Sequence, residues 1–393
     1  MKPLKTSRVI EVCLWVSVFV LLLACVQYFS EGGTWYFNKE FDVNKKISDH
    51  IDIGNLKEAK REEVEIQDIG LVEMNLADAN VEIEFVEGDT VEIVELTNDK
   101  KQENLFETTK KENGLYIERP KNDEIFQFGF MNQSAHLVQV KIPRNLKQEF
   151  IVYTSSGDIE VQNEMVLESV EIGATSGDII LAAVQVGESQ IGATSGDINI
   201  ESIRGSEHQI TTTSGDINIE EGTGDFKIKT TSGKKTLGHI VGNEHEIEAT
   251  SGSTKAQLLE GQCKISSTSG DIQIGQLLGA MENKITSTSG RIGLEEVEGF
   301  GKMKTTSGEI DIDCMTLSGD LDIASISGSI YLGINPEMGS EVEIATVSGD
   351  IEGNADIQYE DRNKHKAAVK IGTGDTYNVQ IKTTSGEVEL DEI

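Results

Sequence analysis

The sequence is poor in basic residues, aromatic residues, prolines and cysteines. Its 34 Lys and Arg stand against 68 Asp and Glu, which gives a formal net charge of −34 at pH 7. Nucleic-acid binding depends on Lys and Arg that displace counterions from phosphates, so this deficit argues against a nucleic-acid partner. Cations or a basic partner suit the acidic surface better.

The four cysteines argue against a disulfide framework and against a cysteine metal site. Cys13 and Cys25 lie in an N-terminal apolar segment, whereas Cys263 and Cys314 are far apart and have no CxxC spacing. Disulfide-rich folds and zinc sites both need closely and regularly spaced cysteines. We therefore expect Cys263 and Cys314 to be small, partly buried residues.

Signatures of catalysis are also missing. The sequence contains no G-x-S-x-G, no H-E-x-x-H and no P-loop. Among its six histidines, His208 and His245 occupy equivalent positions two repeats apart, which at strand spacing is roughly 10 Å and too far for one metal ion. The sequence predicts a protein that is not an enzyme, although fold class by itself does not decide activity.

What the chain has in abundance is glycine, in a turn of the form Thr-Ser-Gly-Asp that returns about every 19 residues. A fixed period of this length is typical of repeat architectures, in which each unit must stack on its neighbours to bury a core. Few prolines and aromatic residues agree with one long solenoid. The structural turn glycines are Gly157, Gly177, Gly196, Gly215, Gly233, Gly252, Gly270, Gly290, Gly308, Gly328, Gly349 and Gly386.

Apolar residues keep a fixed distance from each turn glycine. An isoleucine stands five positions before nearly every one, as at Ile191 and Ile210, and apolar residues stand two and four positions after most of them. Spacing by two places side chains on one face of a strand. A second glycine column halfway round the repeat completes a coil of strand, turn, strand and turn. We expect both columns to supply backbone angles that other residues avoid, and the pattern predicts an all-β parallel β-solenoid.

The N-terminus predicts a membrane anchor. Lys2, Lys5 and Arg8 precede an apolar run over residues 12–26 that is long enough for one transmembrane helix. Basic residues ahead of the run place the N-terminus in the cytoplasm and the body outside, as a single-pass protein of the cell membrane. Alternatively, Leu-Leu-Ala-Cys at residues 22–25 resembles a lipobox, and Cys25 would then carry a lipid.

Four segments follow from these patterns. Residues 1–30 are the anchor or signal, and residues 31–63 are a polar, charged stalk without a clean period. Residues 64–153 alternate apolar and polar side chains and form a β-rich N-terminal cap region. Residues 154–393 carry the solenoid repeats, with an insertion after Gly349 whose register the sequence leaves open.

A resemblance to a known family is carried by three features: the alternating N-terminal region, the strand end Val140-Lys141-Ile142-Pro143 and the serial Thr-Ser-Gly-Asp-Ile-x-Ile units. Over residues 64–393 the chain resembles the bacterial β-strand-repeat “putative adhesin” domain. Related proteins occur in envelope-stress operons of Gram-positive bacteria, typically behind one membrane helix. The resemblance implies a β-solenoid in the cell envelope.

The acidic residue that follows many of the turn glycines is the candidate metal ligand, although Lys234, Ser253, Arg291 and Ser329 interrupt the series. Asp158, Asp178, Asp197 and Asp216 would stack about 5 Å apart, and a Ca²⁺ ion could relieve their repulsion. Calcium needs six to eight oxygens, however, and each coil offers one carboxylate. The alternative is that each Asp forms hydrogen bonds with the turn backbone. No other cofactor is expected.

The threonine two positions before most turn glycines would form a second ladder, from Thr175 to Thr306 and again at Thr384. Its hydroxyl groups could contact a glycan or an ordered surface, although β-branching alone also explains threonine in strands. We expect a membrane-anchored, non-catalytic structural or interaction module whose partner is an envelope protein or a glycan. The alternatives are an accessory role in envelope-stress signalling and a cation-dependent protein that binds or cleaves glycans.

Overall fold

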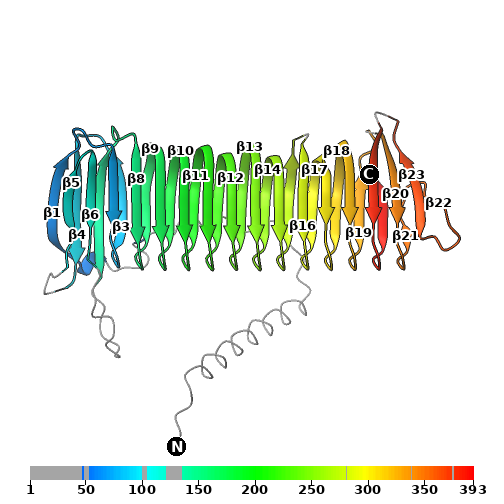
Figure 1. Cartoon of the computed structure of the whole chain (residues 1–393), viewed down its shortest axis with the longest axis horizontal. Helices are drawn as coiled ribbons and strands as arrows, with labels where there is room; N and C mark the ends of the chain where they lie inside the picture. The colour runs from blue at the N-terminus through cyan, green and yellow to red at the C-terminus, as the bar shows by residue number, and fades with distance from the viewer. Residues whose placement is uncertain are drawn as a thin grey trace, which may run out of the picture. The chain divides into compact units, whose positions relative to one another are not determined.

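The computed structural model describes residues 47, 53–99, 104–120, 135–279, 281–337, 339–373 and 376–393. Residues 43–393 form one compact unit. Its described part is one sheet of 25 strands, wound into a solenoid whose coils stack in parallel (Figure 1). The predicted all-β parallel β-solenoid with coils of about 19 residues is therefore confirmed.

The middle of the stack consists of regular coils. Each coil is one long strand that bends at its midpoint, or two shorter strands where the bend interrupts the ladder. Equivalent residues pair in register, so that Ile179 faces Ile198 and Ile191 faces Ile210. The strands are β9 (Ile159–Ala174), β10 (Ile179–Ala193), β11 (Ile198–Thr212), β12 (Ile217–Thr230), β13 (Lys235–Ala249), β14 (Thr254–Ser267), β15 (Ile272–Leu278), β16 (Glu282–Ser287), β17 (Ile292–Lys304) and β18 (Ile310–Ala324).

The apolar columns predicted from the repeat form the core. Ile179, Leu181 and Ile191 of β10 are fully buried, and their equivalents in the neighbouring coils are buried as well. Because side chains alternate across a strand, each coil sends its apolar column into the shared interior and its polar residues outward. Cys263 is buried and Cys314 half-buried, and both are free thiols.

The N-terminal end departs from simple stacking. The coil made by β2 and β3 lies between the coil made by β6 and β7 and the coil made by β8 and β9. A short 3-10 helix, η2 (Ile53–Asn55), precedes these strands, and β1, β4 and β5 are antiparallel additions at the end. The strands are β1 (Lys57–Glu65), β2 (Leu71–Asn75), β3 (Asn80–Val86), β4 (Thr90–Thr97), β5 (Glu107–Lys111), β6 (Gly114–Glu118), β7 (His136–Pro143) and β8 (Glu149–Thr154).

The C-terminal end repeats this arrangement in reverse. The last coil along the chain, β24 and β25, lies between the coil of β18 and β19 and the coil of β20 and β21 (Figure 1). β23 and β22 then continue the sheet as antiparallel strands. The strands are β19 (Ile330–Ile334), β20 (Gly339–Ala345), β21 (Ile351–Glu352), β22 (Gln358–Tyr359), β23 (Lys366–Ile371), β24 (Thr376–Lys382) and β25 (Val388–Glu392).

The turn glycines are required for space. A Cβ atom on Gly215 would lie 1.8 Å from the carbonyl oxygen of Gly196 in the preceding coil, and the other turn glycines meet a carbonyl oxygen at 1.7 to 2.1 Å. None of the twelve has a φ angle in the left-handed region. The expectation that these glycines supply unusual backbone angles is therefore wrong. In the second column, only Gly261, Gly279 and Gly299 have a positive φ angle.

The boundary of the predicted stalk is also corrected. Residues 57–63, assigned to the stalk from their charge, belong to β1, which pairs antiparallel with β4 at the edge of the sheet. Most side chains of β1 are exposed or half-buried, so an edge strand and a solvated stalk have similar compositions. The solenoid itself begins before residue 154, because β2 and β3 already form a coil.

The predicted single-pass membrane localisation is not upheld. Within the described ranges, no helix has the length and apolar character needed to cross a membrane. The apolar run over residues 12–26, on which the prediction of a transmembrane helix was based, lies outside the described residues. Cys25, the alternative lipidation site, lies outside them as well.

Candidate functional site

The acidic residues of the turn form a continuous ladder between coils. The backbone N–H of Asp178 donates to Oδ1 of Asp158 at 2.8 Å, and Asp197 donates in the same way to Asp178 at 2.8 Å. Asp216 and Lys234 extend the series, with N to Oδ1 distances of 2.9 and 2.7 Å. Each carboxylate therefore caps the turn of the next coil. The alternative of backbone hydrogen bonding is confirmed, with the difference that the bonds join neighbouring coils.

This ladder bears on the four calcium candidates. Asp158, Asp178, Asp197 and Asp216 lie one above another at the same edge, as the repeat predicted. In each of them Oδ1 accepts a backbone N–H. Across the residues that the structure describes, no group of three or more His, Cys, Asp or Glu side chains is placed to hold a metal ion. Calcium binding at the ladder stays a prediction.

A column of buried hydroxyl groups also forms hydrogen bonds with the turn. Three positions before the glycine, most coils carry a buried Thr or Ser, whose oxygen accepts the backbone N–H of that glycine. The distance is 3.1 Å for Thr212 and Gly215, and 2.9 Å for Ser267 and Gly270. Thr212 also lies 3.4 Å from the carbonyl oxygen of Gly196 in the preceding coil. The sequence reading missed this column because alanine replaces it in some coils, as at Ala174 and Ala193.

The threonines two positions before the glycine point to solvent instead. From Thr175 to Thr306 every member of this column is exposed, and the following serine is exposed as well. Their backbones join neighbouring coils, as in the 2.9 Å bond from Ser214 N–H to the Thr194 carbonyl oxygen. We call this column the threonine ladder; its members are Thr175, Thr194, Thr213, Thr231, Thr250, Thr268, Thr288 and Thr306.

The threonine ladder changes character at the C-terminal end. Ile326 and Val347 take the threonine position there, with 53% and 67% of their surface exposed. Thr384 lies between them, because Ser385 N–H donates to the Ile326 carbonyl and Ser348 N–H to the Thr384 carbonyl, both at 3.0 Å. The hydroxyl surface is thus continuous over the middle coils and becomes partly apolar at this end.

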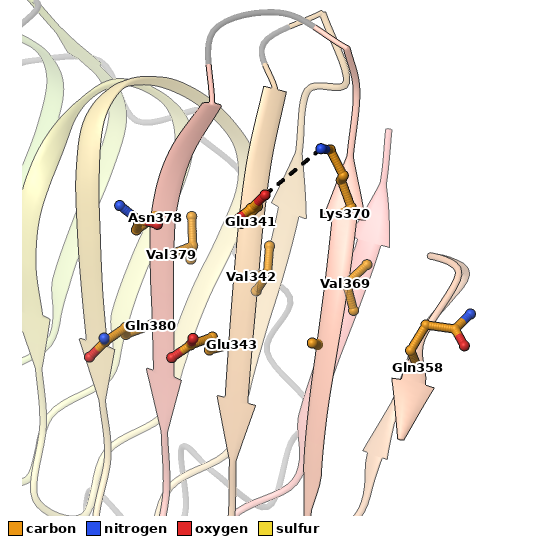
Figure 2. Close-up of a pocket in the computed structure, with 10 residues that line it drawn as sticks. Glu341, Val342, Glu343, Gln358, Val369, Lys370, Asn378, Val379 and Gln380 are labelled. Atoms are coloured by element: carbon orange, nitrogen blue, oxygen red, sulfur yellow. Dashed lines mark ion pairs between the residues drawn. The ribbon is translucent and has the colours of Figure 1, made fainter. Parts of the chain in front are cut away.

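A shallow pocket of about 350 Å³ lies near the C-terminal end, where β23 joins β20. Figure 2 shows Glu341 and Glu343 on β20, Asn378 and Gln380 on β24, and Lys370 on β23, with an ion pair of 3.8 Å between Lys370 and Glu341. These polar side chains are exposed. The sequence did not indicate this pocket, because its lining comes from segments whose register the repeat does not determine.

A buried ionic cluster lies at the N-terminal end. Oε1 of Glu95 is 3.0 Å from Arg119 Nε and 2.9 Å from His136 Nδ1, and its Oε2 accepts the backbone N–H of Phe106 at 2.8 Å. Burial would raise the pKa of Glu95, but these hydrogen bonds and the Arg119 charge outweigh it and hold the pKa below its usual value. The cluster joins both sides of the connection between β6 and β7, which is a structural role.

Comparison with known proteins supports the fold. The profile of the family described as Toastrack DUF4097 matches residues 70–279 and 238–391. A “putative cell adhesion protein” from Clostridium sporogenes is 10% identical, with a TM-score of 0.20, and the match covers 86% of this chain and all of the other. A “putative adhesin” from Parabacteroides distasonis is 13% identical, with a TM-score of 0.31, over 68% of this chain and 96% of the other.

A “putative adhesin” from Bacteroides fragilis is 9% identical, with a TM-score of 0.24, over 85% of this chain and 96% of the other. The comparison with curated proteins gave no match. At these identities and scores the solved structures carry no argument, and membership of the family rests on the sequence profile.

Proposed function

The chain belongs to the Toastrack DUF4097 family, and on that premise we propose that it is a non-catalytic interaction module that presents the threonine ladder to a partner. The proposed partner is a protein or glycan of the bacterial cell envelope. The solenoid would act as a rigid scaffold that holds many identical groups at a fixed spacing.

The observation that carries this proposal is that some polar side chains of the turn are used in hydrogen bonds to the backbone and others are not. The buried hydroxyl column and the Asp carboxylates are hydrogen-bonded to turn backbone. The exposed threonine hydroxyls form no hydrogen bond with other described residues. Adjacent members lie in the turns of neighbouring coils, whose strands are about 4.8 Å apart, so a ligand would meet a regular row of donors and acceptors.

Site-specific photo-crosslinking tests this proposal. A photoreactive amino acid replaces Thr231 on the threonine ladder or, as a matched control, the exposed Gln257 on the outer face of β14. Cells that produce the full chain are irradiated, and crosslinked products are separated under denaturing conditions. We expect a discrete adduct from position 231 and none from position 257, because only the first faces the proposed partner.

Two outcomes would contradict the proposal. Equal adducts from both positions would indicate nonspecific capture, and no adduct from any of positions 194, 213, 231 and 250 would leave the ladder without a partner. Circular dichroism of each purified variant provides the control for folding. These positions are exposed, so the substitutions should change stability by less than about 0.5 kcal/mol.

A further inference from the structure

One outer face of the middle coils is basic, in a chain whose net charge is −34. It consists of the outward residues six and four positions before the turn glycines, on the second half of each coil. From β12 to β18 these positions hold six lysines and three acidic residues. The lysines are Lys227, Lys229, Lys264, Lys284, Lys302 and Lys304, and the acidic residues are Glu246, Glu248 and Asp322.

Three of these lysines stand directly beside one another. Lys264 of β14 pairs in register with Lys284 of β16, and Lys284 pairs with Lys302 of β17. Neighbouring parallel strands are about 4.8 Å apart, so the three amines are presented along a line of about 10 Å. We call Lys264, Lys284, Lys302 and the adjacent Lys304 the lysine face.

The ends of the lysine face are neutralised, but its centre is not. Lys264 is 2.5 Å from Glu246, which raises the pKa of Lys264, and Lys304 is 3.0 Å from Asp322. Among the described residues, Lys284 and Lys302 make no ion pair within 4.0 Å, and of the two only Lys302 stands in register beside an acidic residue, Asp322 of β18. Glu282 is exposed two residues before Lys284 and is the acidic residue on the same strand face.

Such an arrangement is unfavourable in the isolated protein. Like charges directly opposite each other on neighbouring strands destabilise a sheet. A bound anion between Lys284 and Lys302 would remove this repulsion. Because the amines repeat at strand spacing on a rigid sheet, a linear ligand with regularly repeated negative groups would meet them best.

The neighbouring side chains indicate the rest of the ligand. On the same face, Ser266 and Thr286 lie between the lysines and the turn, and Thr268 and Thr288 of the threonine ladder follow at the edge. The coils that carry Lys264 and Lys284 thus each offer an amine followed by two hydroxyls, which can bind the acid groups and hydroxyls of a sugar chain. Acidic residues on the coils to either side leave a basic strip only three coils wide.

We propose that the lysine face binds a linear acidic polysaccharide, with Lys284 and Lys302 contacting its acid groups and the adjoining part of the threonine ladder contacting its hydroxyls. This inference rests on the proposed function and names the partner class for it. A narrow strip suits a single chain better than a nucleic-acid duplex, whose affinity depends on many phosphate contacts.

Binding of defined polymers to the full chain tests the inference. Isothermal titration with polygalacturonate, dextran sulfate and neutral dextran is carried out at about 0.05 M salt and repeated at about 0.3 M. We expect binding of at least one acidic polysaccharide, none of dextran, and weaker binding at the higher salt, because screening shortens the range of the charges. Carboxylate and sulfate polymers distinguish between the two kinds of acid group.

Paired variants locate the site. We expect K284Q/K302Q to weaken binding at least tenfold and K57Q/K147Q, which removes the same charge from exposed positions elsewhere, to change it less than twofold. The inference is wrong if neither acidic polysaccharide binds or if both double variants bind like the parent chain. Binding of poly-L-glutamate in place of the polysaccharides would overturn it in favour of an acidic peptide. Photo-crosslinking at position 231 is measured separately, so an adduct there with no polysaccharide binding would refute only this inference.

Discussion

The middle coils and the two ends of this solenoid solve the same packing problem differently. In the middle, each coil stacks on the coil that precedes it in the sequence, with identical residues in register. At both ends, one coil is inserted between two coils that are otherwise successive. The middle is therefore held by local repetition, and the ends are held by contacts between distant segments.

The inserted coils show why the ends cannot be simple repeats. A solenoid that merely stopped would expose an apolar surface and a free strand edge that could pair with another chain. Here β24 and β25 are covered on both sides, and β23 and β22 continue the sheet as short antiparallel strands. At the other end the edge strand β1 carries a dense run of charges. Each end therefore depends on a coil that is inserted between two others, at the N-terminal end β2 and β3 and at the C-terminal end β24 and β25.

The largest effect should come from removing the inserted C-terminal coil. Deletion of residues 374–393 takes β24 and β25 from between two coils and exposes both of their neighbours. Burial of Val379, Ile381, Val388 and Leu390 is lost, on the order of 6 to 12 kcal/mol. We expect amide protection across β19 to β23 to disappear in hydrogen exchange while β10 to β14 stay protected.

Deletion of residues 53–65, which removes η2 and the edge strand β1, is the matched comparison and should leave β10 to β23 protected. If β19 to β23 kept their protection without residues 374–393, the C-terminal end would not depend on the inserted coil. The proposal that the ends, unlike the middle, are held by contacts between distant segments would then be wrong.

The next largest effect should come from a turn glycine in the middle. In G215A the new Cβ would lie 1.8 Å from the Gly196 carbonyl oxygen, and backbone on both sides must move. We expect a loss of about 3 kcal/mol or more in the free energy of unfolding, measured in urea. G192A, whose Cβ would meet only the Thr211 hydroxyl at 3.3 Å, should cost less than about 1 kcal/mol. Similar losses in both variants would show that spacing between coils does not restrict the turn.

The coil of β2 and β3 shows that glycine is required at the turn only where turns of the same kind stack on each other. Ala79 occupies the glycine position in the turn between β2 and β3, and its carbonyl oxygen lies where a Cβ on Gly157 would clash. The next coil outward joins β6 to β7 through residues 119–135 instead of a short turn. The alanine therefore stands next to a coil whose two strands are joined by a longer connection.

The sequence predicted the middle because its information there is periodic. The glycine and isoleucine columns specify strand, turn and register together, since any other register would place polar residues in the core. The coil of β2 and β3 was missed as a coil because Leu-Ala-Asp-Ala-Asn replaces the turn motif at residues 76–80. The insertion of β24 and β25 has no local signal, because it depends on which distant coil the segment meets.

The candidate site was predictable to a similar extent. Periodicity placed Asp158 to Asp216 and the threonine ladder along one edge, as observed. Periodicity could not show that each Asp carboxylate accepts a hydrogen bond from the next coil, because that depends on how the turns of neighbouring coils are positioned relative to each other. The buried Glu95 cluster joins β4, β7 and the residue that follows β6, which are far apart in sequence, and no pattern connects them.

Lys235 is a charged residue in a core column that is apolar in most of the other middle coils. It stands in the apolar column two positions after Gly233, is fully buried, and its Nζ has no hydrogen-bond partner. Burial lowers the pKa of Lys235 to about 8, against the opposing effect of Asp216. A buried amine of this kind destabilises the coil that contains it.

K235M should therefore stabilise the protein by about 1 to 3 kcal/mol at pH 7, measured in urea. The unfolded lysine binds its proton up to a pKa of about 10.4, so between pH 8 and pH 10.4 the unfolded state holds more protons. Stability of the parent chain should rise with pH across this window, and K235M should lack that rise. A destabilised K235M would show instead that the amine has a favourable role in the core.

The smallest effect should come from two buried histidines of the middle coils. His208 and His245 lie on either side of Phe226, with ring centroids 4.8 and 5.9 Å from that of Phe226. Nε2 of His208 is 3.2 Å from the Thr223 carbonyl oxygen, and Nε2 of His245 is 3.0 Å from that of Glu260. Burial lowers the pKa of both imidazoles, which favours the neutral form in the folded chain.

Unfolded histidine takes up a proton below a pKa of about 6.5, whereas these folded imidazoles do so only at lower pH. The contribution to stability is thus complete above pH 6.5 and decreases as pH falls below it, by at most about 1.4 kcal/mol per histidine for each pH unit. We expect the free energy of unfolding to fall between pH 7 and pH 5.5, and H208Q/H245Q to weaken that dependence. H239Q, at an exposed histidine, is the matched control and should keep it. An unchanged slope in H208Q/H245Q would show that these two imidazoles do not set the acid sensitivity of the middle coils.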